Sequence, residues 1–331
     1  MAAQEKLYRV ALREALGEEM ERDDSVYLIG EDIGKFGGAY RVTDGLLDKF
    51  GADRVVDAPI AEEVIVGTAI GSAMLGLRPV VEMMTINFSL VAYDQIVNNA
   101  AKIRYMFGGE AKVPLVIRMP GGAGHQLSAQ HSHSFEVLYG LIPGLLVVAP
   151  TTPEDAKGML KSAIRTDNPV MFLESMSLYN VRGMVPDGDY TTPLGEAAVR
   201  RTGADLTIVG VSRMAVLANE AAKQLEEEDI DVEVIDLRSI RPIDWATIVK
   251  SVKRTTRCLV VEEGWATYGV TAEIAAGVQE RCFDYLDAPI LRLGGAQVPM
   301  PYSLPLEKVS IPTSEDIKRM ARKVVGRKPD A

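Results

Sequence analysis

The sequence LLVVAPTTPEDAKGMLKSAIRTDNPVMFL, residues 145–173, reads as a strand, a helix and a second strand in direct succession. Its two short apolar runs, Leu145–Ala149 and Val170–Leu173, have the length and composition of buried strands. Between them Thr152 provides a helix cap, a proline takes the first helical position, and two acids follow in the first turn, so we expect a helix that ends near Thr166. Such a unit predicts a parallel α/β sheet.

The same alternation continues in both directions along the chain. Helical patterns lie at Met214–Glu228, around Thr271–Arg281 and from Ser314 onward. Between Glu174 and Asp205 the alternation lapses into a segment rich in Gly, Pro and Asp, which indicates a junction. We therefore predict two α/β domains, 1–190 and a smaller 191–331. Further strands are expected at Val26–Ile29, Val80–Met84, Leu115–Met119, Leu206–Val209, Val232–Asp236, Cys258–Val261 and Ile290–Leu293.

Composition excludes several classes of protein. The 331 residues carry 46 acidic against 36 basic side chains, a net charge of −10, which argues against a nucleic-acid partner. The two cysteines, Cys258 and Cys282, fit a reducing compartment and exclude a cysteine-rich zinc site. The start of the chain has no apolar signal region, and no apolar stretch is long enough to cross a membrane. We expect a cytoplasmic protein with no membrane partner, or alternatively a protein of the plastid stroma.

One predicted helix, Glu62–Leu75, is apolar or small on every side except at its first two residues. It should pack closely against a sheet or a partner. Glu62 and Glu63 either complement the helix dipole or, once desolvated, make a strong hydrogen bond to a ring nitrogen of a ligand. The sequence around the helix does not separate these two interpretations.

All three histidines, His125, His131 and His133, follow a glycine-rich segment just after a predicted strand. Open α/β sheets bind ligands at the carboxyl ends of their strands, so this loop is a candidate for proton transfer. A metal site and a surface loop without a role are the alternatives, and no further metal ligand stands at a suitable spacing. Serine-hydrolase, dinucleotide-binding and P-loop motifs are absent from the sequence.

Six ordered motifs resemble the beta subunits of thiamine-diphosphate-dependent 2-oxo acid dehydrogenases, and the pyruvate dehydrogenases match best. The resemblance extends from Leu7 to about Val325. It implies a transketolase-like architecture, with a pyrimidine-binding domain followed by a smaller transketolase C-terminal α/β domain. The motifs are DAPIAEE (57–63), GLRPVVE (76–82), MTINFS (84–89), AQHS (129–132), DNP (167–169) and DLRSIRPID (236–244).

The resemblance implies roles for single residues. Glu62 matches the carboxylate that hydrogen-bonds the pyrimidine ring of thiamine diphosphate and so assists removal of the thiazolium proton. Phe88 matches an aromatic residue that packs against that ring. His131 matches an active-site histidine that assists acyl transfer to a lipoyl group, whereas no role carries over to His125 or His133.

A potassium ion is also implied, held by backbone carbonyls at Leu115, Ala163, Ile164, Thr166 and Asn168. An ordinary helix end, whose last carbonyls find other partners, is the alternative. The Gly-Asp-Gly motif that binds magnesium and diphosphate in thiamine enzymes has no counterpart in this sequence. The family supplies that site from an alpha subunit, in an alpha2-beta2 heterotetramer.

In the second domain, Val261–Gly264 and Tyr268-Gly269 resemble a region of transketolase C-terminal domains. We expect Glu262 and Glu263 to lie at a strand end and in a solvated turn, or alternatively to form an acidic patch for a basic partner. The resemblance implies docking on the dihydrolipoyl acetyltransferase core. It predicts the beta subunit of pyruvate dehydrogenase, with the branched-chain 2-oxo acid and acetoin dehydrogenases, or a non-catalytic scaffold subunit, as alternatives.

Overall fold

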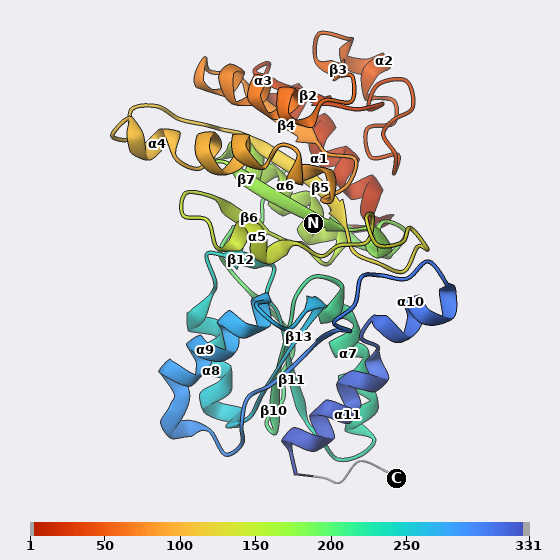
Figure 1. The fold of residues 1–331 in the computed structure, drawn as a ribbon, viewed down its shortest axis with the longest axis vertical. Helices are drawn as coiled ribbons and strands as arrows, with labels where there is room; N and C mark the ends of the chain where they lie inside the picture. The colour runs from red at the N-terminus through yellow and green to blue at the C-terminus, as the bar shows by residue number, and fades with distance from the viewer. Residues whose placement is uncertain (1–2, 327–331) are drawn as a thin grey trace. The chain divides into compact units, whose positions relative to one another are not determined.

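The computed structural model describes residues 3–326 and divides the chain into two compact units (Figure 1). The first unit runs to Gly121 and resumes with Leu138–Leu194. The second unit comprises Gly122–Val137 and the residues from Gly195 onward. The predicted domain limits, 1–190 and 191–331, place the short insert 122–137 with the first half of the chain, whereas its contacts place it with the second unit.

The first unit is built on a parallel sheet in the order β6-β7-β5-β4-β2-β3. All five strands predicted for this half are present, because each is an apolar run buried between helices. β3 was not predicted, because three residues are too few to show a period. The strands are β2 (Val26–Gly30), β3 (Val55–Asp57), β4 (Arg78–Glu82), β5 (Val116–Gly121), β6 (Leu146–Val148) and β7 (Val170–Ser175).

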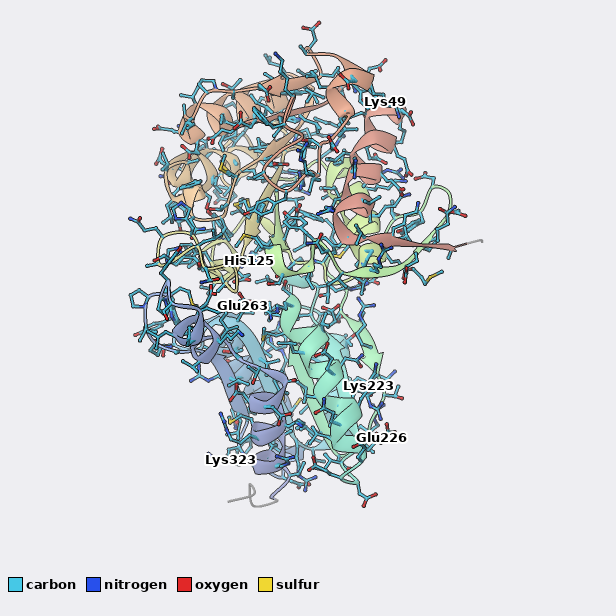
Figure 2. All side chains as sticks on the ribbon, turned by 90° about the vertical axis from the view of Figure 1, so that its right-hand side faces the viewer. Lys49, His125, Lys223, Glu226, Glu263 and Lys323 are labelled. Carbon is cyan, nitrogen blue, oxygen red and sulfur yellow. The ribbon has the colours of Figure 1, made fainter. Side chains whose placement is uncertain are left out.

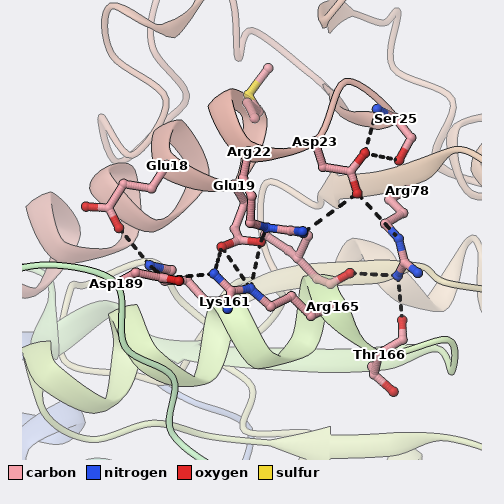
Figure 3. Close-up of polar contacts among 12 residues, drawn as sticks. Glu18, Glu19, Arg22, Asp23, Ser25, Arg78, Lys161, Arg165, Thr166 and Asp189 are labelled. Atoms are coloured by element: carbon pink, nitrogen blue, oxygen red, sulfur yellow. Dashed lines mark hydrogen bonds and ion pairs between the residues drawn. The ribbon is translucent and has the colours of Figure 1, made fainter.

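The predicted cap of α6 (Pro153–Arg165) is confirmed, since Thr152 Oγ1 accepts the N–H of Asp155 at 3.1 Å. The same helix packs along α1 (Tyr8–Arg22), and ion pairs such as Lys161–Glu18 at 2.9 Å join the two (Figure 3). The remaining helical segments of this half are α2 (Leu46–Phe50), α3 (Glu62–Met74), η1 (Phe88–Leu90), the π-helix η2 (Gln95–Ala100), α4 (Ile103–Met106), α5 (Glu136–Gly140) and η3 (Met176–Leu178).

Besides β3, two strands of the first unit were not predicted from the sequence. β1 (Ala3–Leu7) pairs antiparallel with β8 (Arg182–Pro186), outside the parallel sheet. β8 lies in the segment where the strand–helix alternation lapses. A two-stranded ribbon of half-exposed residues has no buried apolar run, so hydrophobicity gives no signal for it.

The second unit has a five-stranded sheet in the order β14-β13-β10-β11-β9, with β9 antiparallel to its neighbour. Helices α7 and α11 cover one face and α8 and α9 the other (Figure 1). The elements predicted for this half are confirmed. Its segments are β9 (Ala198–Arg201), β10 (Leu206–Gly210), α7 (Arg213–Glu226), β11 (Val232–Asp236), β12 (Ser239–Arg241), α8 (Trp245–Thr255), β13 (Cys258–Trp265), α9 (Val270–Cys282), η4 (Phe283–Tyr285), β14 (Leu291–Gly295), α10 (Leu304–Ser310) and α11 (Ser314–Val324).

The helices on the two faces of this sheet pack differently. Ala218, Ala222 and Leu225 of α7 enter a fully buried core with Ile317 and Ala321 of α11. On the opposite face, a Cβ on Gly277 of α9 would lie 2.1 Å from the ring of Trp245 in α8. Glycine is therefore required where the indole ring lies on the helix backbone. Among residues 3–326, none of the helices is long and apolar enough to cross a membrane.

Candidate active site

Glu62 is the first residue of α3, which begins shortly after the carboxyl end of β3. Its side chain is buried, with the residue only 7% exposed, whereas the adjacent Glu63 is exposed. No hydrogen bond joins the Glu62 carboxylate to another residue in the described range 3–326. Buried carboxylates are normally paired, so this oxygen pair is available to a group from outside the chain.

A second carboxyl group lies near Glu62. Glu31 follows the carboxyl end of β2 and is buried. Burial raises its pKa, and the charge of Glu62 raises it further. The sequence analysis missed Glu31, although its place directly after a predicted strand was the available signal.

Phe88 lies on η1, after the carboxyl end of β4, and is half-buried. The backbone of this segment is fixed on both sides. The N–H of Ile86 donates to the carbonyl of Pro120 at 2.7 Å, and Ser89 Oγ donates to the carbonyl of Ile86 and shares a hydrogen bond with the hydroxyl of Tyr139. Glu31, Glu62 and Phe88 thus follow three neighbouring parallel strands at one edge of the sheet, where α/β sheets bind ligands.

A buried ion network ties the same edge of the sheet together. Arg118 of β5 donates two hydrogen bonds to Glu174 of β7, at 2.7 and 2.8 Å, and one to Glu82 of β4 at 2.5 Å. Burial raises the pKa of Glu82, and Arg118 acts in the opposite direction. No local sequence pattern predicts this network, because its residues belong to three separate strands.

The histidine loop, residues 122–137, lies in the second unit. The ring of His133 stacks on Phe135 with 4.2 Å between centroids and meets Trp265 edge-on at 6.1 Å. Burial lowers the pKa of His133, and His131 contributes in the same direction. Burial also lowers the pKa of His125, against the opposing charge of Glu307. His131 is half-buried in this loop. Glu62 and Phe88 therefore belong to one unit and His131 to the other.

The expectation of a solvated turn at Glu262 and Glu263 is wrong. β13 continues through both residues to Trp265. Glu262 is buried and the side chain of Glu263 is only 9% exposed, and this removal from water raises both pKa values. The Glu262 carboxylate accepts the N–H groups of Val270 and Thr271, each at 3.1 Å, at the start of α9. A charge complementary to a helix N-terminus can be held inside the protein in this way, which explains why Glu262 occupies an interior strand.

The carbonyls predicted for potassium lie at the C-terminal end of α6 and the start of β5. Arg78 Nη1 donates to the carbonyls of Ile164 and Thr166, each at 3.0 Å (Figure 3). The Leu115 carbonyl accepts the N–H of Val170 at 2.8 Å. A guanidinium therefore already supplies positive charge at this helix end, and each carbonyl keeps a second lone pair. Within residues 3–326, no group of three or more His, Cys, Asp or Glu side chains is arranged to hold a metal ion.

Two family models match this chain. The transketolase pyrimidine-binding domain matches residues 4–182, and the transketolase C-terminal domain matches residues 195–317. The pyruvate dehydrogenase E1 component subunit beta of Rickettsia felis is 49% identical over 316 residues, which cover 96% of this chain and 97% of that protein. The chain belongs to this family of E1 beta subunits.

Other members of the E1 beta family show similar agreement. The mitochondrial pyruvate dehydrogenase E1 component subunit beta of Dictyostelium discoideum is 48% identical over 330 residues, covering 98% of this chain and 93% of that protein. A solved structure titled split gene transketolase, inactive beta4 tetramer, is 25% identical and covers 97% of this chain and 99% of its own, with a TM-score of 0.79. The transketolase-like fold predicted from the E1 beta motifs is therefore confirmed.

Proposed function

We propose that this chain, together with an alpha subunit, decarboxylates pyruvate oxidatively and transfers the acetyl group to the lipoyl group of dihydrolipoyl acetyltransferase. The full-length similarity to pyruvate dehydrogenase E1 beta subunits supports the reaction. The observation that carries the proposal is the buried Glu62 carboxylate, which has no partner within the described chain. A scaffold subunit would have no reason to keep a buried carboxylate unpaired.

The residues of the first unit fit thiamine diphosphate. When bound, this cofactor would supply an acidic thiazolium carbon that adds to the 2-oxo group. Glu62 would hold a proton in a charge-assisted hydrogen bond to the ring nitrogen of the pyrimidine. Phe88 would give an aromatic surface for the same ring. Glu31, whose pKa is raised by burial, would be a second carboxyl group beside Glu62 at the pyrimidine.

His131 would act in the second half of the reaction. An imidazole is the side chain that titrates nearest neutral pH, so His131 could donate a proton to the lipoyl sulfur as the acetyl group is transferred. The loop that carries it is anchored in the second unit. His125 and His133 are given no catalytic role.

The alpha subunit would bind on the apolar helix α3. One side of this helix is buried, whereas Val64 is 64% exposed and the flanking Ile60 and Leu75 are 81% and 88% exposed. Exposed apolar side chains at both ends of one helix are typical of a protein interface. Magnesium and the diphosphate would be held by the alpha subunit. The chain alone should then bind thiamine diphosphate weakly, and submicromolar binding would contradict this arrangement.

We further propose a potassium ion at the carbonyls of Leu115, Ala163, Ile164, Thr166 and Asn168, and docking of the second domain on the acetyltransferase core. Oxygen atoms at a helix C-terminus attract cations, which favours the ion site.

Both cysteines are free and buried, in keeping with a cytoplasmic enzyme.

The substrate is tested by reconstituting the chain with its alpha subunit and thiamine diphosphate and following reduction of an artificial acceptor. We expect kcat/KM for pyruvate to exceed that for 3-methyl-2-oxobutanoate by about 100-fold, or about 2.7 kcal/mol. The reverse preference would identify a branched-chain enzyme. Turnover with neither substrate would favour acetoin dehydrogenase or a scaffold subunit.

A further inference from the structure

Two carboxylates of the second unit bind the backbone of the histidine loop. Glu263 Oε1, on β13, accepts the N–H of Ala123 at 2.6 Å. Glu307 Oε1, on α10, accepts the N–H groups of Gly124 and Gln126, each at 3.0 Å, and its Oε2 accepts the N–H of Gln126 at 3.2 Å. Figure 2 labels His125 on this loop and Glu263 on β13. The loop is thus held by main-chain atoms close to the histidines.

Glu307 is unusual in how its charge is compensated. The residue is only 1% exposed, and within the described part of the chain no lysine or arginine pairs with it. Backbone N–H groups do this instead, as in the anion-binding concavities formed when successive residues adopt left-handed backbone conformations. Gly124 and Gln126 have φ values of +98° and +54°, which turns both N–H groups toward the same carboxylate.

Glycine is needed for this close approach. Gly122 has a φ of +95°, and a Cβ at this position would lie 2.8 Å from Glu263 Oε1. The glycine-rich stretch identified in the sequence therefore lets the backbone reach two buried acids. It does not simply make the loop flexible.

A backbone hydrogen bond also joins the two ends of the loop, so fixing the position of one end restrains the other. The N–H of Gly122 donates to the carbonyl of His133 at 2.9 Å, and the N–H of His131 donates to the carbonyl of Ser128 at 3.3 Å. His131 therefore lies between the segment bound by the two carboxylates and the residue that closes the loop.

We propose that Glu307 and Glu263 are positioning residues that clamp the backbone of the loop and so hold His131 in place for acetyl transfer to the lipoyl group. This inference rests on the proposed role of His131. It assigns to the second domain a part in the chemistry, in addition to assembly.

The test uses Glu307→Gln in the reconstituted alpha–beta complex, with two activities measured side by side. We expect acetylation of a lipoyl domain to lose about 10–100-fold in kcat, because a small displacement of a reacting group has effects of this size. Reduction of an artificial acceptor, which needs no lipoyl acetylation, should stay within about threefold of wild type. Hydrogen exchange at the amides of residues 123–126 should be faster by about tenfold or more.

Glu262→Gln is the matched control, because Glu262 is also a buried carboxylate of the same unit that binds backbone N–H groups, but those of Val270 and Thr271 in α9. It should leave the ratio of the two activities and the exchange of 123–126 unchanged. A parallel fall of both activities in both variants would mean that Glu307 is only structural, and unchanged exchange in Glu307→Gln would overturn the clamp.

Glu307→Asp provides a second variant if Glu307→Gln does not fold, since it keeps the charge and shortens the arm. We expect a smaller loss of acetylation than in Glu307→Gln, with exchange at 123–126 between that of Glu307→Gln and wild type. His131→Ala tests the role of His131 in acetyl transfer separately from the clamp on the loop backbone. If it leaves acetylation intact, the role of His131 is wrong, whereas the exchange data still decide whether the clamp exists.

Discussion

Arg118 and Glu174 form a bidentate ion pair inside the first unit, with both nitrogen–oxygen distances below 3 Å and neither side chain more than 1% exposed. The pair joins β5 to β7, and Glu82 of β4 completes the network. Buried charges are tolerated only when each is compensated. The network therefore makes the position of three strand ends depend on one guanidinium group.

Replacement of Arg118 by methionine should strongly destabilise the protein. It would leave two buried carboxylates without a cation, a loss of about 3–5 kcal/mol in the free energy of unfolding. Urea unfolding followed by circular dichroism measures the difference. Arg182→Met is the control, since Arg182 and Glu5 are exposed and 3.5 Å apart, and it should change stability by less than about 1 kcal/mol.

Glu62→Gln should abolish cofactor-dependent activity while leaving the fold intact. An amide cannot exchange a proton with the ring nitrogen as the Glu62 carboxyl group would, so we expect a loss of at least about 100-fold in kcat. The activity of the reconstituted complex is measured at saturating thiamine diphosphate. Glu63→Gln, next in the chain but exposed, should retain wild-type activity. Full activity of Glu62→Gln would support the scaffold reading.

Glu136 should make the protein less stable as the pH rises. Burial, together with the charges of Glu262 and Glu263, raises its pKa to about 8 from the ordinary glutamate value of 4.5. A carboxyl group with a raised folded-state pKa stabilises the fold fully below pH 4.5, and this contribution is lost as the pH rises toward 8. Glu136→Gln should be more stable than wild type at pH 8.5 by up to about 4 kcal/mol and nearly equal to it at pH 5. Equal stability at both pH values would show that Glu136 ionises normally.

A charge among the exposed apolar side chains of α3 should prevent assembly. Val64→Glu puts a carboxylate at the centre of the proposed alpha interface, where it would be desolvated without a partner. We expect size-exclusion chromatography to show no complex with the alpha subunit, while circular dichroism of the chain stays unchanged. Val199→Glu, at a comparably exposed apolar position on β9, should assemble normally. Normal assembly of Val64→Glu would exclude this face as the interface.

Potassium should stabilise the protein if the carbonyls at the end of α6 bind it. An ion at ten times its Kd adds about 1.4 kcal/mol, which corresponds to a rise of about 3 °C in Tm. The comparison is between potassium chloride and choline chloride at equal ionic strength. Arg78→Ala, which removes the guanidinium from Ile164 and Thr166, should increase the potassium effect. If the Tm of each protein, wild type and Arg78→Ala, is the same in both salts, the potassium site is ruled out.

Much of the fold and part of the site could be read from the sequence. Buried strands such as Val170–Leu173 and the capped helix at Pro153 are local features, because one face of each element must be apolar and its ends must be satisfied. Glu62, Phe88 and His131 stand in motifs whose spacing identifies the family. Strands without a buried apolar run, such as β1 and β8, gave no such signal.

The sequence by itself determined the α/β class, the order of the two domains, the family and the residues that we assign to catalysis, since all of these are written in local patterns and motifs. Only the tertiary structure decided which distant residues act on them. It placed the histidine loop, encoded between β5 and α5, in the second unit, where Glu263 and Glu307 bind its backbone more than 130 positions away along the chain. It also brought Glu31 near Glu62 and turned Glu262 inward. A buried carboxylate finds its N–H or cationic partner wherever folding brings one within hydrogen-bond distance, and sequence separation does not restrict that choice.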